Sequence, residues 1–367
     1  MSLSYYLAMT LPVTVVCGLN RAATSDAGRA LLSPSSDSHL VTHCLDQIHI
    51  GLVSRTTVSG FGHIDAALID LAHGCVSCTL REDVLPTLRD MAADPKVGHV
   101  ILVLPESVEP IGFLESFLFY TAEDGRSAAE LCHIEAVMAV LEPAALVTMM
   151  ANHETLADRG LNIGDTDNRG LGDLLVGQIE CADVILAPGA NPQEMRLLRL
   201  LNPDARLHTA QPLSIPATFN WSATNARTSP ALIDHLVQEC DSADAWRMGW
   251  RSHRPLHPTR LHDALQDIAG VALRGRGHFQ IATRPSSLIE WDSVGRQLRL
   301  GSPDTDIPRR GANLCFVGVS DERDRIAAAL DAAQLTDEEH MSPATSWAIV
   351  QDPFQDIWLN QLDLGDQ

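Results

Sequence analysis

The sequence of 367 residues contains a single lysine. That residue is Lys96, so arginine supplies 25 of the 26 basic side chains. A site that needs lysine at several fixed positions cannot be built from this chain. An uninterrupted run of eighteen apolar residues is also missing, so we predict no membrane-spanning helix. The apolar start, Leu3–Leu19, has no basic residues before it, and we predict no signal peptide.

Clustered positive charge is the second absence. The formal net charge is −21, and phosphate contacts need grouped cations, so we expect no direct binding to DNA, other nucleic acids or a membrane. An acidic chain can still reach a ribosome through a basic protein partner. The eight cysteines are scattered apart from one close pair, which favours reduced thiols and a cytoplasmic location.

The first part of the chain alternates strand and helix patterns. Continuous apolar runs predict strands at Pro12–Cys17 and His99–Leu104, and a helix is expected to lead into a strand at Asp183–Leu186. We also predict helices over Ile64–Ala72, which has a helical apolar period, and over Leu80–Ala93. Such alternation indicates an α/β fold with a mostly parallel sheet.

From Trp246 onward the pattern changes to short strands and helices, which is typical of a smaller α+β domain. We expect four regions: a first domain at 1–212, a linker at 213–243, a second domain at 244–336 and an aromatic tail at 337–367. The tail contains Trp347, Phe354 and Trp358, which could pin it onto a domain or dock a partner.

The close cysteine pair lies in the segment Ala72-His73-Gly74-Cys75-Val76-Ser77-Cys78-Thr79-Leu80-Arg81. Two thiolates at this spacing can hold one tetrahedral zinc ion, but they fill only half of its coordination shell. His73 is a candidate third ligand. Redox chemistry, which the entry to a helix would favour, and two inert cysteines are the alternatives.

This segment resembles the Gly-Cys-x-Cys-Cys-Thr-Leu-Arg motif of the CobW family of P-loop GTPases, which includes zinc metallochaperones, with Ser77 in place of the middle cysteine. The stretch Gln178–Leu186 is similar to the family's helix-strand segment, and Arg254–Leu261 is similar to the opening of the CobW C-terminal domain. The resemblance implies a degenerate P-loop domain with a mostly parallel sheet, followed by a smaller α+β CobW C-terminal domain.

The phosphate-binding motif of that family is degraded. A P-loop needs Gly-x-x-x-x-Gly-Lys-[Ser/Thr], whereas this chain has Gly18-Leu19-Asn20-Arg21-Ala22-Ala23-Thr24-Ser25. Gly18 survives, but Thr24 stands at the lysine position. Ser25 is either the magnesium ligand or only an N-cap, and Arg21 is a weak substitute cation.

Two further nucleotide motifs are altered. Glu106, after the expected strand His99–Leu104, is a relic carboxylate or a solvated loop acid. The chain has Ala187-Pro188-Gly189-Ala190 where the family has the guanine-binding Asn-Lys-x-Asp. We therefore expect zinc as the cofactor, no GTP or magnesium, and no catalytic residue.

The degenerate motifs and the tail are similar to those of the actinobacterial ribosome hibernation factor-recruiting proteins (Mrf). This resemblance implies a zinc-responsive adaptor that recruits a ribosome hibernation-promoting factor to the small ribosomal subunit through protein contacts. The alternative is a GTP-dependent zinc metallochaperone of the CobW family. A zinc-storage or zinc-sensing protein is a third possibility.

Overall fold

The computed structural model describes residues 10–34, 36–164, 167–211, 215–230, 232–233, 244–268, 270–302, 311–319, 321–347 and 349–355. No helix within these ranges is both long and apolar enough to cross a membrane. The described chain forms two compact units.

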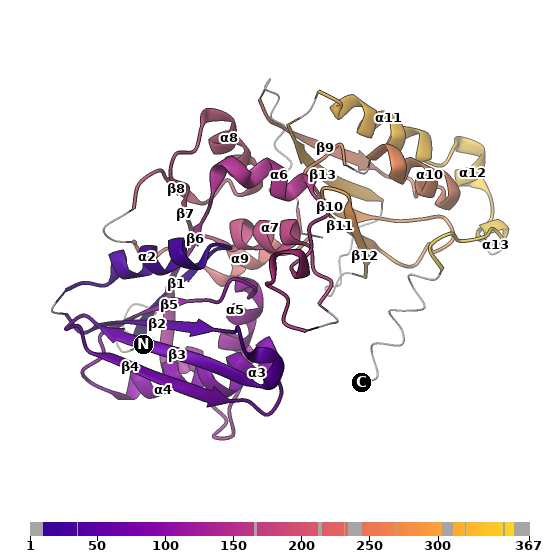
Figure 1. The fold of residues 1–367 in the computed structure, drawn as a ribbon. Coiled ribbons are helices and arrows are strands. Elements are labelled where there is room, and N and C mark those ends of the chain that lie inside the picture. The colour runs from indigo at the N-terminus through magenta and orange to yellow at the C-terminus, as the bar shows by residue number, and fades with distance from the viewer. Residues whose placement is uncertain are drawn as a thin grey trace, which may run out of the picture. The chain divides into compact units, whose positions relative to one another are not determined.

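An eight-stranded sheet forms the centre of the first unit (Figure 1). In spatial order its strands are β4 (Ile64–Asp70), β3 (Leu52–Ser59), β2 (Ser38–Cys44), β5 (His99–Val103), β1 (Leu11–Cys17), β6 (Cys132–Val140), β7 (Val184–Leu186) and β8 (Arg206–His208). The last six strands in this order, which are β2, β5, β1, β6, β7 and β8, pair in parallel. Strands β3 and β4 are antiparallel additions at one edge. The predicted α/β fold with a mostly parallel sheet is confirmed.

Helices cover both faces of this sheet. They are α2 (Arg21–Leu31), α3 (Val76–Thr79), the π-helical turn η2 (Leu80–Val84), α4 (Leu85–Ala93), α5 (Pro110–Phe119), α7 (Leu171–Cys181) and α9 (Trp221–Thr228). Gly28 of α2 packs closely on Leu40 and Val103. Arg55 donates to Thr87 of α4 and pairs with His43, three residues from Leu40 and therefore on the other face, so α2 and α4 lie on opposite faces (Figure 1). Buried residues of β1, β5, β6 and β7 form the core beneath α2.

The helix predicted over Ile64–Ala72 is wrong, because Ile64–Asp70 forms β4. Apolar residues four apart, such as Ile64 and Leu68, fit a helical period, but an even spacing also places them on one face of a strand. Pairing with β3 over seven residues decided between the two. Pairing with β3, which the local sequence does not show, made this segment a strand despite its helical spacing of apolar residues.

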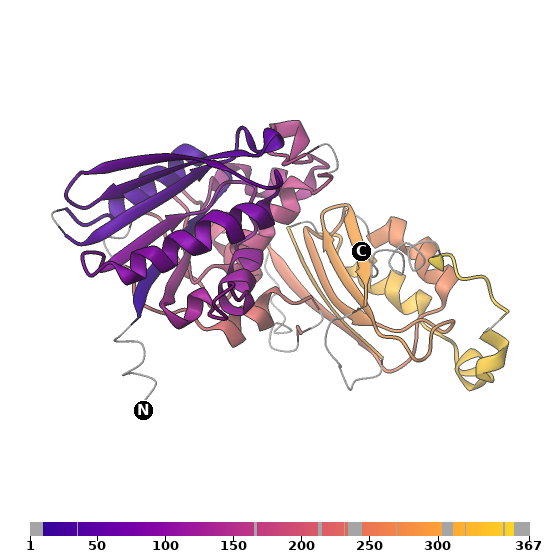
Figure 2. The same cartoon turned by 90° about the horizontal axis from the view of Figure 1, so that it is seen from below.

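The second unit contains an antiparallel sheet in the order β12 (Gln297–Gly301), β11 (Ile289–Val294), β10 (Arg274–Phe279), β13 (Ala312–Gly318) and β9 (Trp246–Ser252). Helices α10 (Pro258–Ile268) and α11 (Arg323–Ala333) pack on one face of it (Figure 2). The core is aromatic: Phe279, Trp291 and Phe316 meet edge to face. This is the α+β domain expected after Trp246.

The unit boundaries differ from the predicted domains in two places. Residues 147–153 and helix α8 (Pro192–Leu201) belong to the second unit, although they precede the predicted boundary at 212. The predicted linker 213–243 contains α9, which Asn220 caps by accepting a hydrogen bond from the Ala223 amide. Trp221 packs edge to face on Phe119, so the start of α9 belongs to the first unit. The residues 234–243 lie outside the described ranges.

The tail beyond 337 starts with two short helices, α12 (Asp337–Met341) and α13 (Ala344–Trp347). Phe354 is buried in the aromatic core of the second unit, and Trp347 packs edge to face on His257. These two aromatic residues therefore serve the fold of their own unit. Trp358 lies outside the described residues.

Candidate metal-binding motif and degenerate nucleotide loop

The Cys75–Cys78 pair lies at the start of α3, beside the carboxyl ends of the parallel strands. The Cys75 side chain caps this helix by accepting a hydrogen bond from the Cys78 amide, with a Sγ–N distance of 3.0 Å. Both thiols are half-buried. Gly74 allows the close approach that precedes the helix, because a Cβ atom there would clash with the carbonyl oxygen of Ile48.

The environment of Cys78 does not favour its thiolate. The hydrogen bond with the Cys75 side chain, followed by partial burial, raises the pKa of Cys78 to about 11. A reactive thiol needs a lowered pKa and a positive environment. No disulfide joins the described cysteines. Cys78 therefore lacks the lowered pKa of a redox nucleophile, so the redox alternative would have to rest on Cys75.

The described residues do not complete a metal shell around the pair. Within them, no group of three or more His, Cys, Asp or Glu side chains is close enough to hold a metal ion. His73 is exposed, and only its backbone carbonyl meets the motif, where it accepts a hydrogen bond from the Cys75 amide. His73 as a third ligand is therefore not assembled in this structure.

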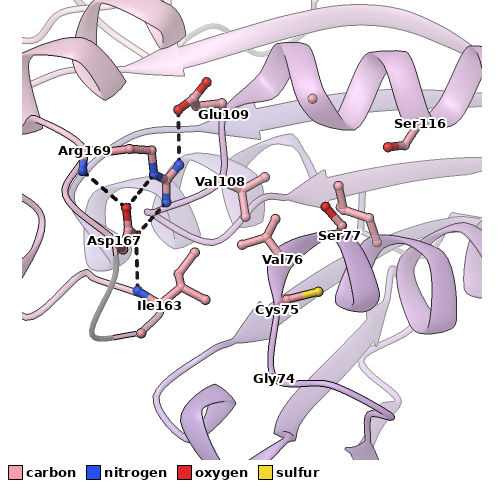
Figure 3. A pocket seen from close by; sticks show the side chains of 13 residues that line it. Gly74, Cys75, Val76, Ser77, Val108, Glu109, Ser116, Ile163, Asp167 and Arg169 are labelled. Carbon is pink, nitrogen blue, oxygen red and sulfur yellow. Dashed lines mark hydrogen bonds and ion pairs between the residues drawn. The ribbon is translucent and has the colours of Figure 1, made fainter. Parts of the chain in front are cut away.

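Cys75 faces a cleft of about 490 Å³ (Figure 3). Val76, Val108 and Ile163 form its apolar lining. On the wall opposite the cysteine, the guanidinium of Arg169 binds both oxygens of Asp167 at 2.9 Å. It also donates to Glu109 at 3.1 Å. Because this arginine is already paired with two carboxylates, it offers no surplus positive charge to an anion in the cleft.

The loop Gly18–Ser25 forms a strand-to-helix turn, as a P-loop would, but the amides of Ala23 and Thr24 and the Thr24 hydroxyl are bonded within the loop. Asn20 is the N-cap of α2 and accepts the Ala23 amide at 3.0 Å. Thr24 is buried, and its hydroxyl donates to the carbonyls of Asn20 and Arg21. Ser25 lies inside α2, so its interpretation as an N-cap is wrong: the polar residue that precedes the helix is Asn20.

Arg21 projects from this loop into two carboxylates. Its guanidinium donates to both oxygens of Asp46, at 2.7 and 3.0 Å, and to Glu106 at 2.5 Å. We call these three residues the Arg21 cluster. Glu106 is only 7% exposed, so the solvated-acid interpretation of this residue is wrong. The sequence offers Arg21 as a substitute cation for phosphate, but in the cluster this chain's own acids neutralise the guanidinium.

The residues present do not fit a nucleoside triphosphate. A cavity of about 290 Å³ lies beside the Arg21 cluster, and Asp46 and Glu106 line it. Glu142 is close by and accepts a hydrogen bond from the Asn20 amide group at 2.6 Å. Three carboxylates therefore surround the loop where phosphates would need cations. At the guanine position, Gly189 forms a left-handed turn within Ala187–Ala190 and no carboxylate is present.

The Arg21 cluster predicts a small acid-sensitive term in stability. Hydrogen bonds from Arg21 lower the pKa of Asp46 from 3.8 to about 2. This folded-state pKa is depressed, so the stabilisation is present above about pH 4 and is lost as pH falls towards 2. Asp46 is 62% exposed, so we expect Asp46→Asn to cost below about 1 kcal/mol at pH 6. Urea unfolding of both proteins should show this gap closing on acidification; a gap independent of pH would contradict the assignment.

A buried ionic network supports the cysteine motif from the other side. Asp83, in η2, bonds to Nε2 of His43 on β2 at 2.7 Å and to Arg55 on β3 at 2.5 Å. The side chains of His43 and Asp83 are 0% and 5% exposed. The network ties the helix that continues from Cys78 to the sheet. Sequence patterns did not reveal it, although an acid in an amphipathic helix and a histidine in an apolar strand are both present.

Comparisons with known proteins agree with this two-unit organisation. The model of the CobW/HypB/UreG nucleotide-binding domain matches residues 47–190, a range that starts after the loop Gly18–Ser25. The model of the cobalamin synthesis protein CobW C-terminal domain matches residues 246–334. The second range lies within the predicted domain 244–336.

Individual relatives match most of this chain at low identity. The zinc chaperone Rv0106 of Mycobacterium tuberculosis is 26% identical over 95% of this chain and 94% of its own length. Zinc-regulated GTPase metalloprotein activator 1 of Dictyostelium discoideum is 23% identical over 79% of this chain and 70% of its own length.

Among solved structures, the Zn(II)-bound YjiA GTPase from E. coli is 14% identical over 89% of this chain and 99% of its own. Its TM-score of 0.37 is too low to support an inference about function. The two domain models match in order along one chain and cover separate parts of it. The chain is similar to the CobW/HypB/UreG nucleotide-binding domain over residues 47–190 and to the CobW C-terminal domain over residues 246–334.

Proposed function

We propose that this protein binds zinc through Cys75 and Cys78 and passes it to a protein acceptor, as a metallochaperone that does not turn over GTP. The observation that carries the proposal is the cysteine pair at the first turn of α3, with Cys75 at the wall of an open cleft. Relatives named as a zinc chaperone and a zinc-regulated metalloprotein activator support it. They favour this function over the predicted ribosomal adaptor.

Among the described residues the zinc shell around the pair is incomplete, and an incomplete shell suits transfer better than storage. Zinc in a structural site takes four protein ligands, whereas an open site keeps a position for an exchangeable ligand. Two thiolates from this chain leave positions that water or an acceptor's side chains can fill. An acceptor that enters the cleft beside Cys75 could add its ligands before the pair releases the metal. The third and fourth ligands are then supplied in trans.

The Arg21 cluster supports the nucleotide-independent part of the proposal. It places Asp46 and Glu106 against the only cation of the loop, so a bound phosphate would have to break two ion pairs and face the released carboxylates. One relative is named as a GTPase, so the loss of GTP turnover is proposed for this chain and not for that relative.

A competition titration tests the metal site. Zinc is divided between the protein and a chromophoric chelator for the wild type, Cys75→Ser and Cys78→Ser, with Ser77→Ala as the matched control between the two cysteines. Loss of a direct ligand should weaken binding by about 100-fold or more, since even outer-shell changes cost about 10- to 100-fold. Ser77→Ala should match the wild type. Equal affinity in all four proteins would mean that the two cysteines are inert.

Recruitment of a hibernation-promoting factor to the small ribosomal subunit remains a prediction from the resemblance alone. A pull-down from zinc-starved cells, probed for ribosomal proteins and that factor, separates the two functions. Co-purification that survives Cys75→Ser and Cys78→Ser would favour an adaptor. If the protein is a chaperone, the pull-down should capture a metalloenzyme, and this capture should require both cysteines.

A further inference from the structure

Strand β4 ends the eight-stranded sheet on one side and has β3 as its only strand partner among the described residues. The amide of Leu71 donates to Gly51, and the carbonyl of His63 accepts from Ser59, both towards β3. Peptide groups alternate sides along a strand. The N–H and C=O groups of Ile64, Ala66, Leu68 and Asp70 therefore face outward from the sheet edge.

This edge lacks the devices that usually prevent pairing. Natural edge strands carry lysine, proline or a bulge. The seven residues of β4 contain no lysine or proline, and their register with β3 is unbroken. The two acids, Asp65 and Asp70, lie towards its ends. A free edge of this length is a template for another strand.

The same residues expose an apolar surface. Ile64 and Leu68 are 65% and 64% exposed. Ile64 pairs with Val58, which pairs with Leu40 beneath α2, so Ile64 and Leu68 lie on the α2 face of the sheet. Figure 1 shows α2 over the inner strands and β4 beyond it. An edge with both free peptide groups and uncovered apolar side chains fits a partner that brings the same two features.

A second copy of this chain meets that requirement in one register. A two-fold axis perpendicular to the sheet passes through a pair formed by the same residue of both chains. Centred on Ala66, it places Ile64 of each chain opposite Leu68 of the other. Asp65 then faces Ala67, so no acid faces an acid across the junction despite the net charge of −21. Centred on Ala67 or Leu68 instead, Ile64 would face Asp70 or Ala72 and lose its large apolar partner.

We propose that two copies associate through β4 in antiparallel fashion, centred on Ala66, to extend one sheet across both molecules. The contact is a single pair of strands, so it belongs with small, reversible interfaces. Neither the cysteine motif nor the Arg21 cluster takes part, so this proposal stands independently of the proposed function.

Sedimentation velocity of the full chain tests it, from about 1 to about 200 µM at about 0.15 M salt, where the screening length is about 8 Å. The wild type should shift from monomer to dimer with concentration. Ala66→Pro removes an outward N–H that makes no bond to β3, so it should keep the fold and stay monomeric. Ile64→Arg should also stay monomeric, while the same change at Ile349, exposed by 89% and far along the chain, should dimerise like the wild type.

Mixing two variants tests the register. Ile64→Arg and Leu68→Glu should each be monomeric alone, but a mixture should dimerise, because the Ala66-centred register sets the new cation opposite the new anion. Circular dichroism melting checks that each variant is folded. A wild type that stays monomeric throughout, or an Ala66→Pro variant that dimerises equally, would overturn the proposal. A folded mixture that stays monomeric would overturn the register.

Discussion

Replacing Asp83 by alanine is expected to lower the free energy of unfolding by about 3 kcal/mol, since removing one partner leaves buried polar groups unpaired. Asp83 is 4% exposed and bonds to both His43 and Arg55. Arg55 retains some contact with water, which places the cost at the lower end of the range for buried pairs. Urea unfolding monitored by circular dichroism measures the change.

Asp90→Ala is the matched control. Asp90 is an exposed carboxylate in α4, seven residues further along the same helical stretch. Its removal should change stability by less than about 0.5 kcal/mol. Because the network ties η2 to β2 and β3, zinc affinity should also fall in Asp83→Ala under conditions where the variant remains folded. Equal stability of Asp83→Ala and Asp90→Ala would mean that the buried network contributes nothing.

The second large effect concerns GTP. The wild type with magnesium should bind a fluorescent GTP analogue no tighter than the millimolar range. Hydrogen bonds to charged groups contribute about 1.5–3 kcal/mol each, so loss of the loop lysine and the guanine-binding carboxylate together weakens binding by about 1000-fold or more. Fluorescence anisotropy with and without magnesium measures this directly.

Arg21→Ala separates the two possible roles of Arg21. If it stood in for the missing lysine, the wild type would bind GTP and the variant would not. The Arg21 cluster predicts instead that neither binds, because Asp46 and Glu106 already hold the guanidinium. Micromolar, magnesium-dependent binding by the wild type would restore the GTP-dependent metallochaperone that the family resemblance also allows.

Local sequence was sufficient for the inner strands of the first sheet. Runs such as His99–Leu104 are apolar on both faces because helices cover both sides, and that composition is visible without a structure. The edge was not predictable in the same way. Ile64–Asp70 carries apolar residues that are not buried. The spacing of these apolar residues therefore does not reflect burial and does not indicate the secondary structure of the segment.

The candidate site also has a part that the sequence predicts and a part that it does not. Sequence by itself determined the cysteine pair, whose spacing of three residues is a local property, and the loss of lysine and glycine from the phosphate loop. Only the tertiary structure decided what replaced them. Arg21 meets Asp46 and Glu106 across 25 and 85 residues, and Asp83 meets His43 across 40. Such contacts depend on which strand ends the sheet brings together. Residues that are far apart along the chain become neighbours only when the sheet forms, so the sequence alone does not show which residues pair.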